Sequence, residues 1–384
     1  MKEHFLLDPN ITYLNFASFG ACPKIIFDDY QKWQLELERE PVQFIANKSL
    51  HYLKQSRRAL AEYIGGDADD LVYVTNPSYA VNIIAKGLNL KPNNEILTTN
   101  LEYGACDKTW DYYGEKTHAK IVRQTISLPI TSKEKLIEEF FKGLTSNTKA
   151  IFVSHITSST ALILPVNEIC ELAKTKGLIT IVDGAHVPGH IPLNLAELKA
   201  DFYTGACHKW MMTAKGSSFL YIRKEFQPLD PLVVSWGYQS AHPSHSTFLD
   251  YHQMQGTRDL SAFLTIPKAI EFMKEHNWIE KSNACKELVI NNAHRFFELL
   301  NTKPLSPLTK EFIGQMISFS IKTDSPETLQ KHLFEKYKIE IPVMRHNQHI
   351  FLRYSVNAFN TQTDLDNLYV ALQEIIVTTD LLKV

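Results

Sequence analysis

Apolar positions change their spacing along the chain. Residues 26–63 place Trp33, Leu37, Leu53 and Leu60 at roughly helical intervals, which predicts helix. Short β-rich runs follow at 71–75, 96–99, 150–154, 179–182 and 217–222, with amphipathic segments such as 79–88 and 166–176 between several of them. Strands that alternate with helices are typical of a mostly parallel sheet covered on both faces. Ligands of such sheets bind beyond the carboxyl ends of the strands.

After about residue 260 the pattern changes. A long helical stretch covers 260–300 and is interrupted at Asn277, and Pro304 and Pro307 then mark a loop. The remaining pattern predicts a strand at 315–321, a helix at 325–337, a strand at 349–354 and a helix at 363–377. This part is expected to form a smaller α+β domain. Because no Pro/Gly-rich linker precedes it, the two domains are expected to join through a helix.

Composition and charge exclude several classes of protein. The chain has 384 residues and a formal net charge of −2, so no strong field favours nucleic acid or an anionic membrane. No stretch reaches the roughly 18 apolar residues of a membrane helix, and the first residues contain no apolar run typical of a signal peptide. The five cysteines include no CxxC pair, which fits a reducing compartment. We therefore expect a cytoplasmic protein that binds neither nucleic acid nor membrane.

A carboxylate ends one of the predicted strands. In the string ITIVDGAH (179–186) the β-branched run stops at Asp183, before Gly184 and Ala185. A buried carboxylate is costly unless it has a partner. Asp183 either caps a turn at the end of the strand or binds a cationic nitrogen of a ligand.

The string DFYTGACHKW (201–210) places a lysine among apolar neighbours. Loss of hydration favours the neutral amine of Lys209, which is the nucleophile that forms a Schiff base. The alternative is a surface lysine whose stem packs on apolar atoms. A metal site at Cys207 and His208 is disfavoured because no second ligand pair has metal spacing, and His242 and His245 stand alone. No metal is expected.

The string LVYVTNPS (71–78) predicts a helix start. Asn76 is a good N-cap, and Pro77 suits the first helical turn. Free backbone N–H groups there, with the Ser78 hydroxyl, would bind an anion. Any capped helix has this pattern, so it carries little weight alone.

Taken together, these segments resemble the class V aminotransferases, which are pyridoxal phosphate (PLP) enzymes of fold type I, and most closely the branch of isopenicillin N epimerase-like proteins and C–S lyases. Eight strings carry the resemblance in the family's order: YLNFASFGACPK (13–24), VTNPSYAVNIIAKGL (74–88), TTNLEYGACD (98–107), SHITSSTALILPV (154–166), VDGAHVPGHIPLNL (182–195), DFYTGACHKWM (201–211), QGTRDLSAF (255–263) and FLRYSVNAFNT (351–361). The resemblance implies an α/β fold with a seven-stranded, mostly parallel sheet. It also implies a large PLP-binding domain at 21–260 and a small domain made of 1–20 and 261–384.

The resemblance implies roles for the residues that would hold the cofactor ring. Lys209 would form the Schiff base, and Asp183 would keep the pyridine nitrogen protonated so that the ring is an electron sink. His186 would lie near the phenolic oxygen, with Ser158 or Thr157, and Tyr103 would stack on the ring.

The phosphate and the substrate would meet other residues. Pro77, Ser78 and His208 would hold the phosphate, and Thr257 would reach the phosphate of the neighbouring subunit in a homodimer with shared active sites. Arg353 would bind the substrate α-carboxylate in a bidentate fork, and residues 15–20, with Asn15 and Ser18, would line the substrate entrance.

Two departures from the family pattern bear on function. Many relatives have a serine three residues before the lysine, where this chain has Ala206; Tyr203 would then be expected to substitute as a phosphate contact. Cysteine desulfurases carry a sulfur-accepting cysteine shortly before the carboxylate-binding arginine. Residues 338–353 (KIEIPVMRHNQHIFLR) contain no cysteine, which argues against persulfide-forming chemistry.

The expected activity is α-proton removal from an amino acid or a derivative, followed by epimerisation or by β-elimination as in a C–S lyase. Transamination is the alternative within the family. A non-catalytic binding protein on the same fold would lack Lys209, Asp183 or Arg353, and all three are present.

Overall fold

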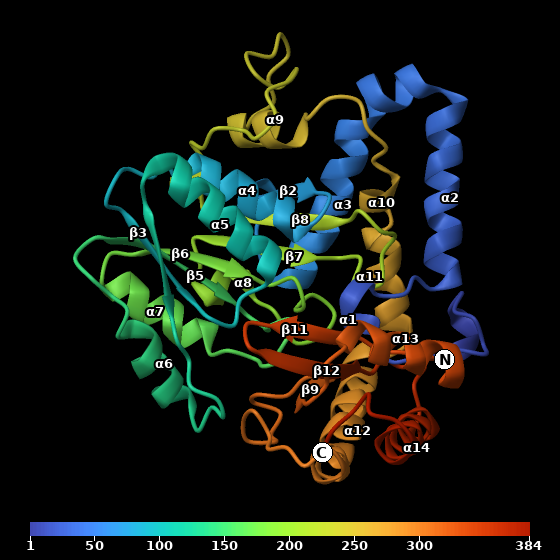
Figure 1. The fold of residues 1–384 in the computed structure, drawn as a ribbon. Helices are drawn as coiled ribbons and strands as arrows, with labels where there is room; N and C mark the ends of the chain where they lie inside the picture. Colours follow the sequence, from blue (N-terminus) through green and yellow to red (C-terminus); the bar gives the residue numbers. More distant parts are fainter.

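The computed structural model describes residues 1–384, and a seven-stranded sheet lies at its centre (Figure 1). The strands have the order β2-β8-β7-β6-β5-β3-β4. They span Leu71–Val74 (β2), Glu95–Thr99 (β3), Lys120–Gln124 (β4), Thr148–Ser154 (β5), Ile179–Asp183 (β6), Phe202–Ala206 (β7) and Ser218–Ile222 (β8). Only β8 is antiparallel to its neighbours, β2 and β7. The mostly parallel sheet that the sequence predicts is confirmed.

Helices cover both faces of this sheet because alternate side chains of each strand point to opposite faces. Phe152 and Ile181 belong to one apolar cluster, which packs under α4 (Pro77–Gly87), α5 (Gly104–Thr117) and α9 (Thr247–Gln253). Ile151 and Val182 belong to the larger cluster on the other face, with α3 (Ser49–Ile64), α6 (Lys133–Phe141), α7 (Val166–Thr175), α8 (Leu195–Leu198), α10 (Ser261–Leu264) and α11 (Ile266–Glu275). Each strand except the edge strand β4 thus buries both of its faces.

A second, antiparallel sheet of three strands lies below the seven-stranded sheet in the view of Figure 1. Its order is β11 (Val343–His346), β12 (His349–Ser355) and β9 (Met316–Ile321), with α12 (Trp278–Leu299), α13 (Pro326–Tyr337) and α14 (Gln362–Thr378) beside it. The N-terminal segment joins this region, because β1 (Thr12–Tyr13) pairs in parallel with β10 (Ile339–Glu340). The short helix α1 (Phe16–Phe19) follows β1. The domain boundaries at 20/21 and 260/261 stay a prediction.

The structure corrects the expected elements in two respects. The helix expected over 26–63 is interrupted: α2 (Lys24–Arg39) ends before Pro41, and a π-helical stretch at Gln43–Lys48 leads into α3. Proline removes a backbone donor, which explains the interruption. Five strands were not predicted, namely β1, β4, β7, β10 and β11. β4 lies at the sheet edge with polar residues at both ends, and β7 (FYTGA) contains glycine and alanine, so neither has a strong strand signature.

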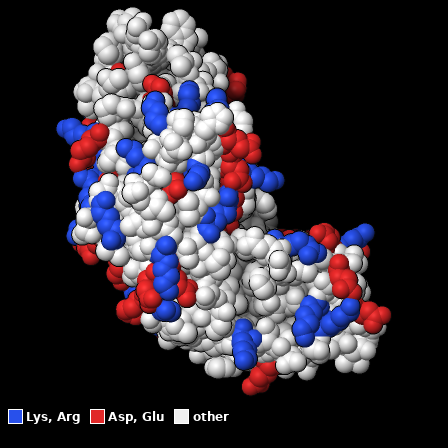
Figure 2. Space-filling view, turned by 60° about the vertical axis from the view of Figure 1, so that its left-hand side comes forward, with Lys and Arg blue, Asp and Glu red and all other residues white.

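The surface shown in Figure 2 carries basic and acidic side chains intermixed. None of the helices combines the length and the apolar character that crossing a membrane requires.

Candidate active site

The predicted site residues follow strands that end at one edge of the large sheet. β2, β3, β5, β6 and β7 run in the same direction, because β2 and β7 are both antiparallel to β8. Ser78, Tyr103, Ser158, His186 and Lys209 follow the carboxyl ends of these strands, and Asp183 is itself the last residue of β6. Parallel sheets bind ligands at this edge.

Asp183 is the last residue of β6 and is only 4% exposed. Its Oδ1 accepts a hydrogen bond from the Ala185 N–H at 2.9 Å, and its Oδ2 lies 3.6 Å from Cys106 Sγ. Burial raises the pKa of the carboxyl, while the charge on Lys209 opposes that rise. The turn contact predicted by the simpler interpretation is therefore present. No basic side chain forms an ion pair with this buried carboxylate, which leaves it suited to a cationic ring nitrogen.

Lys209 lies in the turn after β7, with its Nζ 3.4 Å from His186 Nε2. Burial lowers the pKa of the lysine to about 8, although the nearby Asp183 charge opposes this. A substantial fraction of the amine is then neutral near physiological pH, as Schiff-base formation requires. The alternative of an extended surface lysine is wrong, because the amine is directed at a buried imidazole.

Arg353 is the fifth of the seven residues of β12 and is 1% exposed. Its Nη1 donates to the Ser158 carbonyl at 2.6 Å, and its Nη2 donates to Ser18 Oγ at 3.2 Å. Its Nε has no partner, and no carboxylate pairs with the guanidinium. The alternative of a structural ion pair is therefore wrong. A buried guanidinium without an anion is suited to a substrate carboxylate.

The N-terminal segment connects Arg353 to Lys209. The Ser18 hydroxyl, which accepts from Arg353, also lies 2.5 Å from Asn15 Oδ1. Gly20 has a φ of +65°, and a side chain there would overlap the backbone of His208 and Lys209. A glycine is thus required for this segment to pass so close to the lysine turn.

The start of α4 is built as the sequence predicts. Asn76 Oδ1 accepts from the Tyr79 N–H at 2.8 Å, and Pro77 is the first helical residue. Pro77 has no N–H, and the Ala80 N–H bonds to the Asn76 carbonyl. The Ser78 N–H and hydroxyl are the donors left at this helix start for an anion.

Several of the predicted cofactor-binding residues lie away from this edge of the sheet or bond to other groups. Tyr203 packs in the apolar cluster on the face opposite α4, with its hydroxyl 3.2 Å from His155 Nδ1, so it does not lie beside the α4 anion donors. The Thr157 hydroxyl is buried and bonds to Thr160 and the Leu162 N–H. Thr257 is exposed and outside the cluster of candidates. Tyr103 is 47% exposed at the N-cap of α5.

The other histidines that the sequence singled out have defined contacts. His208 Nδ1 lies 2.8 Å from the Ser217 carbonyl, and burial lowers the pKa of this histidine to about 4. His245 Nε2 pairs with Asp69 at 2.7 Å. Nowhere do three His, Cys, Asp or Glu side chains gather as metal ligands.

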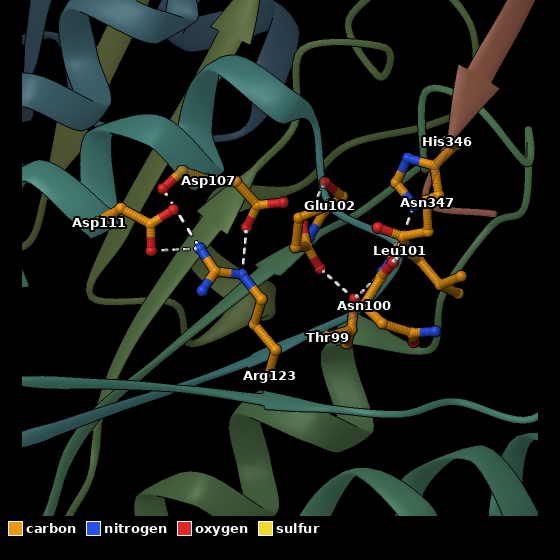
Figure 3. A network of polar contacts seen from close by, with 10 residues as sticks. Thr99, Asn100, Leu101, Glu102, Asp107, Asp111, Arg123, His346 and Asn347 are labelled. Atoms are coloured by element: carbon orange, nitrogen blue, oxygen red, sulfur yellow. Dashed lines mark hydrogen bonds and ion pairs between the residues drawn. The ribbon is translucent and has the colours of Figure 1, made fainter.

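Sequence reasoning missed a polar network beside Tyr103, shown in Figure 3. Glu102 is 1% exposed, bonds to Thr99 and Ser154, and has its pKa raised to about 8 by burial. His346 and Asn347, in the β11–β12 hairpin, both donate to the Asn100 carbonyl, at 2.8 and 3.1 Å. The β11–β12 hairpin therefore contacts the segment that leads into Tyr103. These residues carry no local motif, because strands far apart in sequence bring them together.

The arrangement fits a PLP cofactor. The buried carboxylate of Asp183 has no ion-pair partner, and the pKa of Lys209 is lowered. Both lie at the same edge of the sheet as the N-terminus of α4 and the buried guanidinium of Arg353, which has no anionic partner. Fold and site together define a PLP-dependent enzyme of fold type I.

The particular family follows from the sequence. The family model for class V aminotransferases matches residues 25–368, and the chain belongs to this family. Its cofactor is accordingly pyridoxal 5′-phosphate.

Individual relatives cover nearly the whole chain. Isopenicillin N epimerase of Streptomyces clavuligerus is 32% identical over 97% of this chain and 96% of its own. A probable chloroplastic L-cysteine desulfhydrase of Arabidopsis thaliana is 26% identical over 88% of this chain and 75% of its own. Among solved structures, a C-DES mutant with glycine covalently linked to its PLP cofactor has a TM-score of 0.85 at 18% identity, over 97% of this chain and 99% of that one.

Arg353→Lys tests the carboxylate fork. Lysine keeps the charge but loses the paired donors. We expect KM for an amino-acid substrate to rise about tenfold, since a hydrogen bond to a charged group contributes about 1.5 kcal/mol. The absorbance of the bound cofactor should not change before substrate is added.

Arg295→Lys is the matched control, because Arg295 pairs with Asp366 at 2.6 Å away from the sheet edge. That change should lower the melting temperature and leave KM unaltered. The same result in Arg353→Lys would remove Arg353 from the site.

Proposed function

We propose that this protein removes the α-proton from an amino acid or an amino-acid derivative, in a PLP-dependent reaction of the epimerase or C–S lyase type. The observation that carries the proposal is the buried guanidinium of Arg353, which has no anionic partner and faces the Ser18 and Ser158 oxygens. An α-carboxylate supplies the missing charge. The isopenicillin N epimerase and cysteine desulfhydrase relatives support both reaction types.

Each group of the chain then has a defined task. Arg353 and Ser18 orient the substrate through its carboxylate. Asp183 holds a proton on the ring nitrogen of the cofactor, and the Lys209 amine takes the α-proton as general base. PLP, when bound, supplies an electron sink next to the α-carbon. Tyr103, at the N-cap of α5, would cover the ring, and His186 would hold the proton at its Nε2 close to Lys209.

The hairpin at His346–His349 argues against a desulfurase. It has no cysteine to accept sulfur, and its His346 side chain is committed to the Asn100 carbonyl. A C–S lyase reaction would therefore release its sulfur product to solvent. Transamination, and binding without catalysis, remain the alternatives.

A substrate screen tests the proposal. L-amino acids, including cysteine, cystine and N-terminally extended cysteine derivatives, are incubated with the PLP-loaded enzyme. Sulfide or persulfide together with pyruvate identifies elimination, and the D-isomer identifies epimerisation. Keto-acid exchange without either product would replace the proposal by transamination, and no solvent-deuterium exchange at any α-carbon would contradict it.

The active protein is proposed to be a cytoplasmic homodimer with shared sites. All five cysteines are free, which is consistent with a reducing compartment. A PLP phosphate carries nearly two negative charges, whereas a helix start offers about half a positive charge. At α4 the Ser78 N–H and hydroxyl are free donors, and Ala206 adds no hydroxyl. The exposed Thr257, which follows Gly256 at φ +93°, is the donor proposed to reach the partner's phosphate.

Mixing two inactive variants tests this sharing. In a heterodimer of Lys209→Ala and Thr257→Trp, both lesions fall on one site and the other site is intact. Random mixing should therefore restore about a quarter of the wild-type activity, since half of the dimers carry one working site.

Thr378→Trp, an exposed change at the end of α14, serves as the control and should be active alone. Heterodimers that form without regaining activity, or a monomer that turns over at high dilution, would exclude the shared site.

A further inference from the structure

The indole of Trp210 contacts the His186 ring on the side that faces away from Lys209. Trp210 Nε1 lies 3.4 Å from His186 Nδ1. An indole N–H can only donate, so Nδ1 must be the acceptor. Burial holds the pKa of His186 well below its ordinary value, so the ring is neutral. A neutral ring that accepts at Nδ1 carries its proton on Nε2.

Trp210 cannot easily turn away from this contact. Its ring stacks on His190 at 4.0 Å between centroids, and Phe16 packs at 5.2 Å. His190 is itself fixed at both nitrogens: Nδ1 bonds to the His186 carbonyl at 2.9 Å, and Nε2 accepts from the Gln315 N–H at 2.6 Å. The contacts with Phe16 and His190 thus hold the indole N–H toward His186.

The proton on His186 Nε2 favours the neutral form of the Lys209 amine. His186 Nε2 lies 3.4 Å from Lys209 Nζ. An Nε2–H can donate to a neutral amine, but an ammonium has no lone pair to accept it. We infer that Trp210 is a positioning residue that fixes the tautomer of His186 and thereby keeps the Lys209 amine neutral and nucleophilic. If Trp210 did not donate, His186 could take the other tautomer and accept a hydrogen bond from an ammonium.

Other groups facing Lys209 also act on the pKa of its amine. Burial lowers its pKa to about 8, the Asp183 charge raises it, Arg353 lowers it and Cys106 raises it. His208, the adjacent residue, has its pKa lowered to about 4 by burial, so it adds no charge near neutral pH. Because this pKa lies close to physiological pH, a hydrogen bond whose direction is fixed can shift the protonation state of the amine.

The inference rests on the proposed function in one respect, namely that Lys209 is the lysine that binds the cofactor. Its first test needs no variant. Nitrogen NMR of the full-length, cofactor-free chain labelled in its histidine rings reports which nitrogen of His186 is protonated, with the signal assigned by its loss in His186→Gln. We expect the Nε2–H tautomer, and an Nδ1–H tautomer would overturn the inference whatever the enzyme's reaction.

The second test measures the amine. Trp210→Phe keeps an aromatic ring to stack on His190 and removes the indole donor. The pH dependence of Lys209 acetylation by acetic anhydride, followed by peptide mass spectrometry, reports the neutral fraction. We expect its midpoint to rise by about one pH unit, which leaves about tenfold less neutral amine at pH 7.

Trp110→Phe is the matched control, because Trp110 is fully buried and its indole N–H has no partner. It should leave the Lys209 midpoint unchanged. An unchanged midpoint in Trp210→Phe, or an equal rise in both variants, would overturn the inference. Covalent PLP mapped to a lysine other than Lys209 would contradict the proposed function and leave the tautomer result standing.

Discussion

Lys209→Ala should abolish the covalent linkage to PLP and reduce turnover by at least about 10³-fold, because general base catalysis alone contributes on the order of 10² to 10⁴. The change removes the amine that faces His186 Nε2 at 3.4 Å, and no other lysine amine makes that contact. The start of α4 and His208 are unchanged, so PLP should still bind non-covalently. Borohydride reduction followed by peptide mapping measures the linkage, and a direct assay of α-proton exchange measures the loss of the base.

Lys215→Ala is the control for Lys209→Ala. Lys215 lies six residues further along the same loop, and its side chain is exposed. This variant should retain both linkage and turnover. A reduced adduct found on a lysine other than Lys209 in the wild-type chain would refute the assignment.

The sequence predicted the parts of the site that follow from local structure. Asp183 ends a buried strand that the sequence predicted, and Asn76 with Pro77 forms the expected helix start. Such patterns depend on a few neighbouring residues, so they can be identified without the fold. The carboxyl-edge rule then places them together, since the strands that carry them run in one direction.

The contacts between distant segments could not be predicted in this way. Ser18, Ser158 and Arg353 meet because the N-terminal segment, the end of β5 and β12 converge. The tautomer of His186 depends on Trp210, whose indole is held by His190. No sequence spacing identifies either group of residues as part of one site, because their side chains are neighbours only in the folded chain.

Tyr203 shows that the direction of a side chain cannot be predicted when its strand is not predicted. Successive side chains of a strand point to opposite faces, so the face of each residue of β7 is fixed once one is known. Phe202 lies in the cluster beneath α4, and Tyr203 therefore points to the opposite face, toward His155. Because β7 itself was not predicted from the sequence, this alternation could not be used to test Tyr203 as a phosphate contact.

Asp183→Asn should leave PLP bound but slow α-proton removal on the order of 10²-fold, because losing a well-placed electrostatic contact costs about 3 kcal/mol at the transition state. The carboxylate is buried and has no basic partner in the chain, so a cationic ring nitrogen would be its main counter-charge. An amide of the same shape keeps the contact with the Ala185 N–H and cannot balance that charge. The primary deuterium isotope effect on α-proton removal should therefore increase as this step becomes rate-limiting.

Asp201→Asn separates this electrostatic effect from a general loss of stability. Asp201 is also a buried carboxylate beside the large sheet, but it pairs with Arg223 at 2.9 Å and accepts from the Thr180 N–H. It precedes β7 and so lies at the amino edge, away from Lys209. Asp201→Asn should lower the melting temperature and leave the cofactor absorbance and the isotope effect unchanged. Near-normal turnover in Asp183→Asn, or the same stability loss without a kinetic change, would mean that the Asp183 carboxylate only closes the turn after β6.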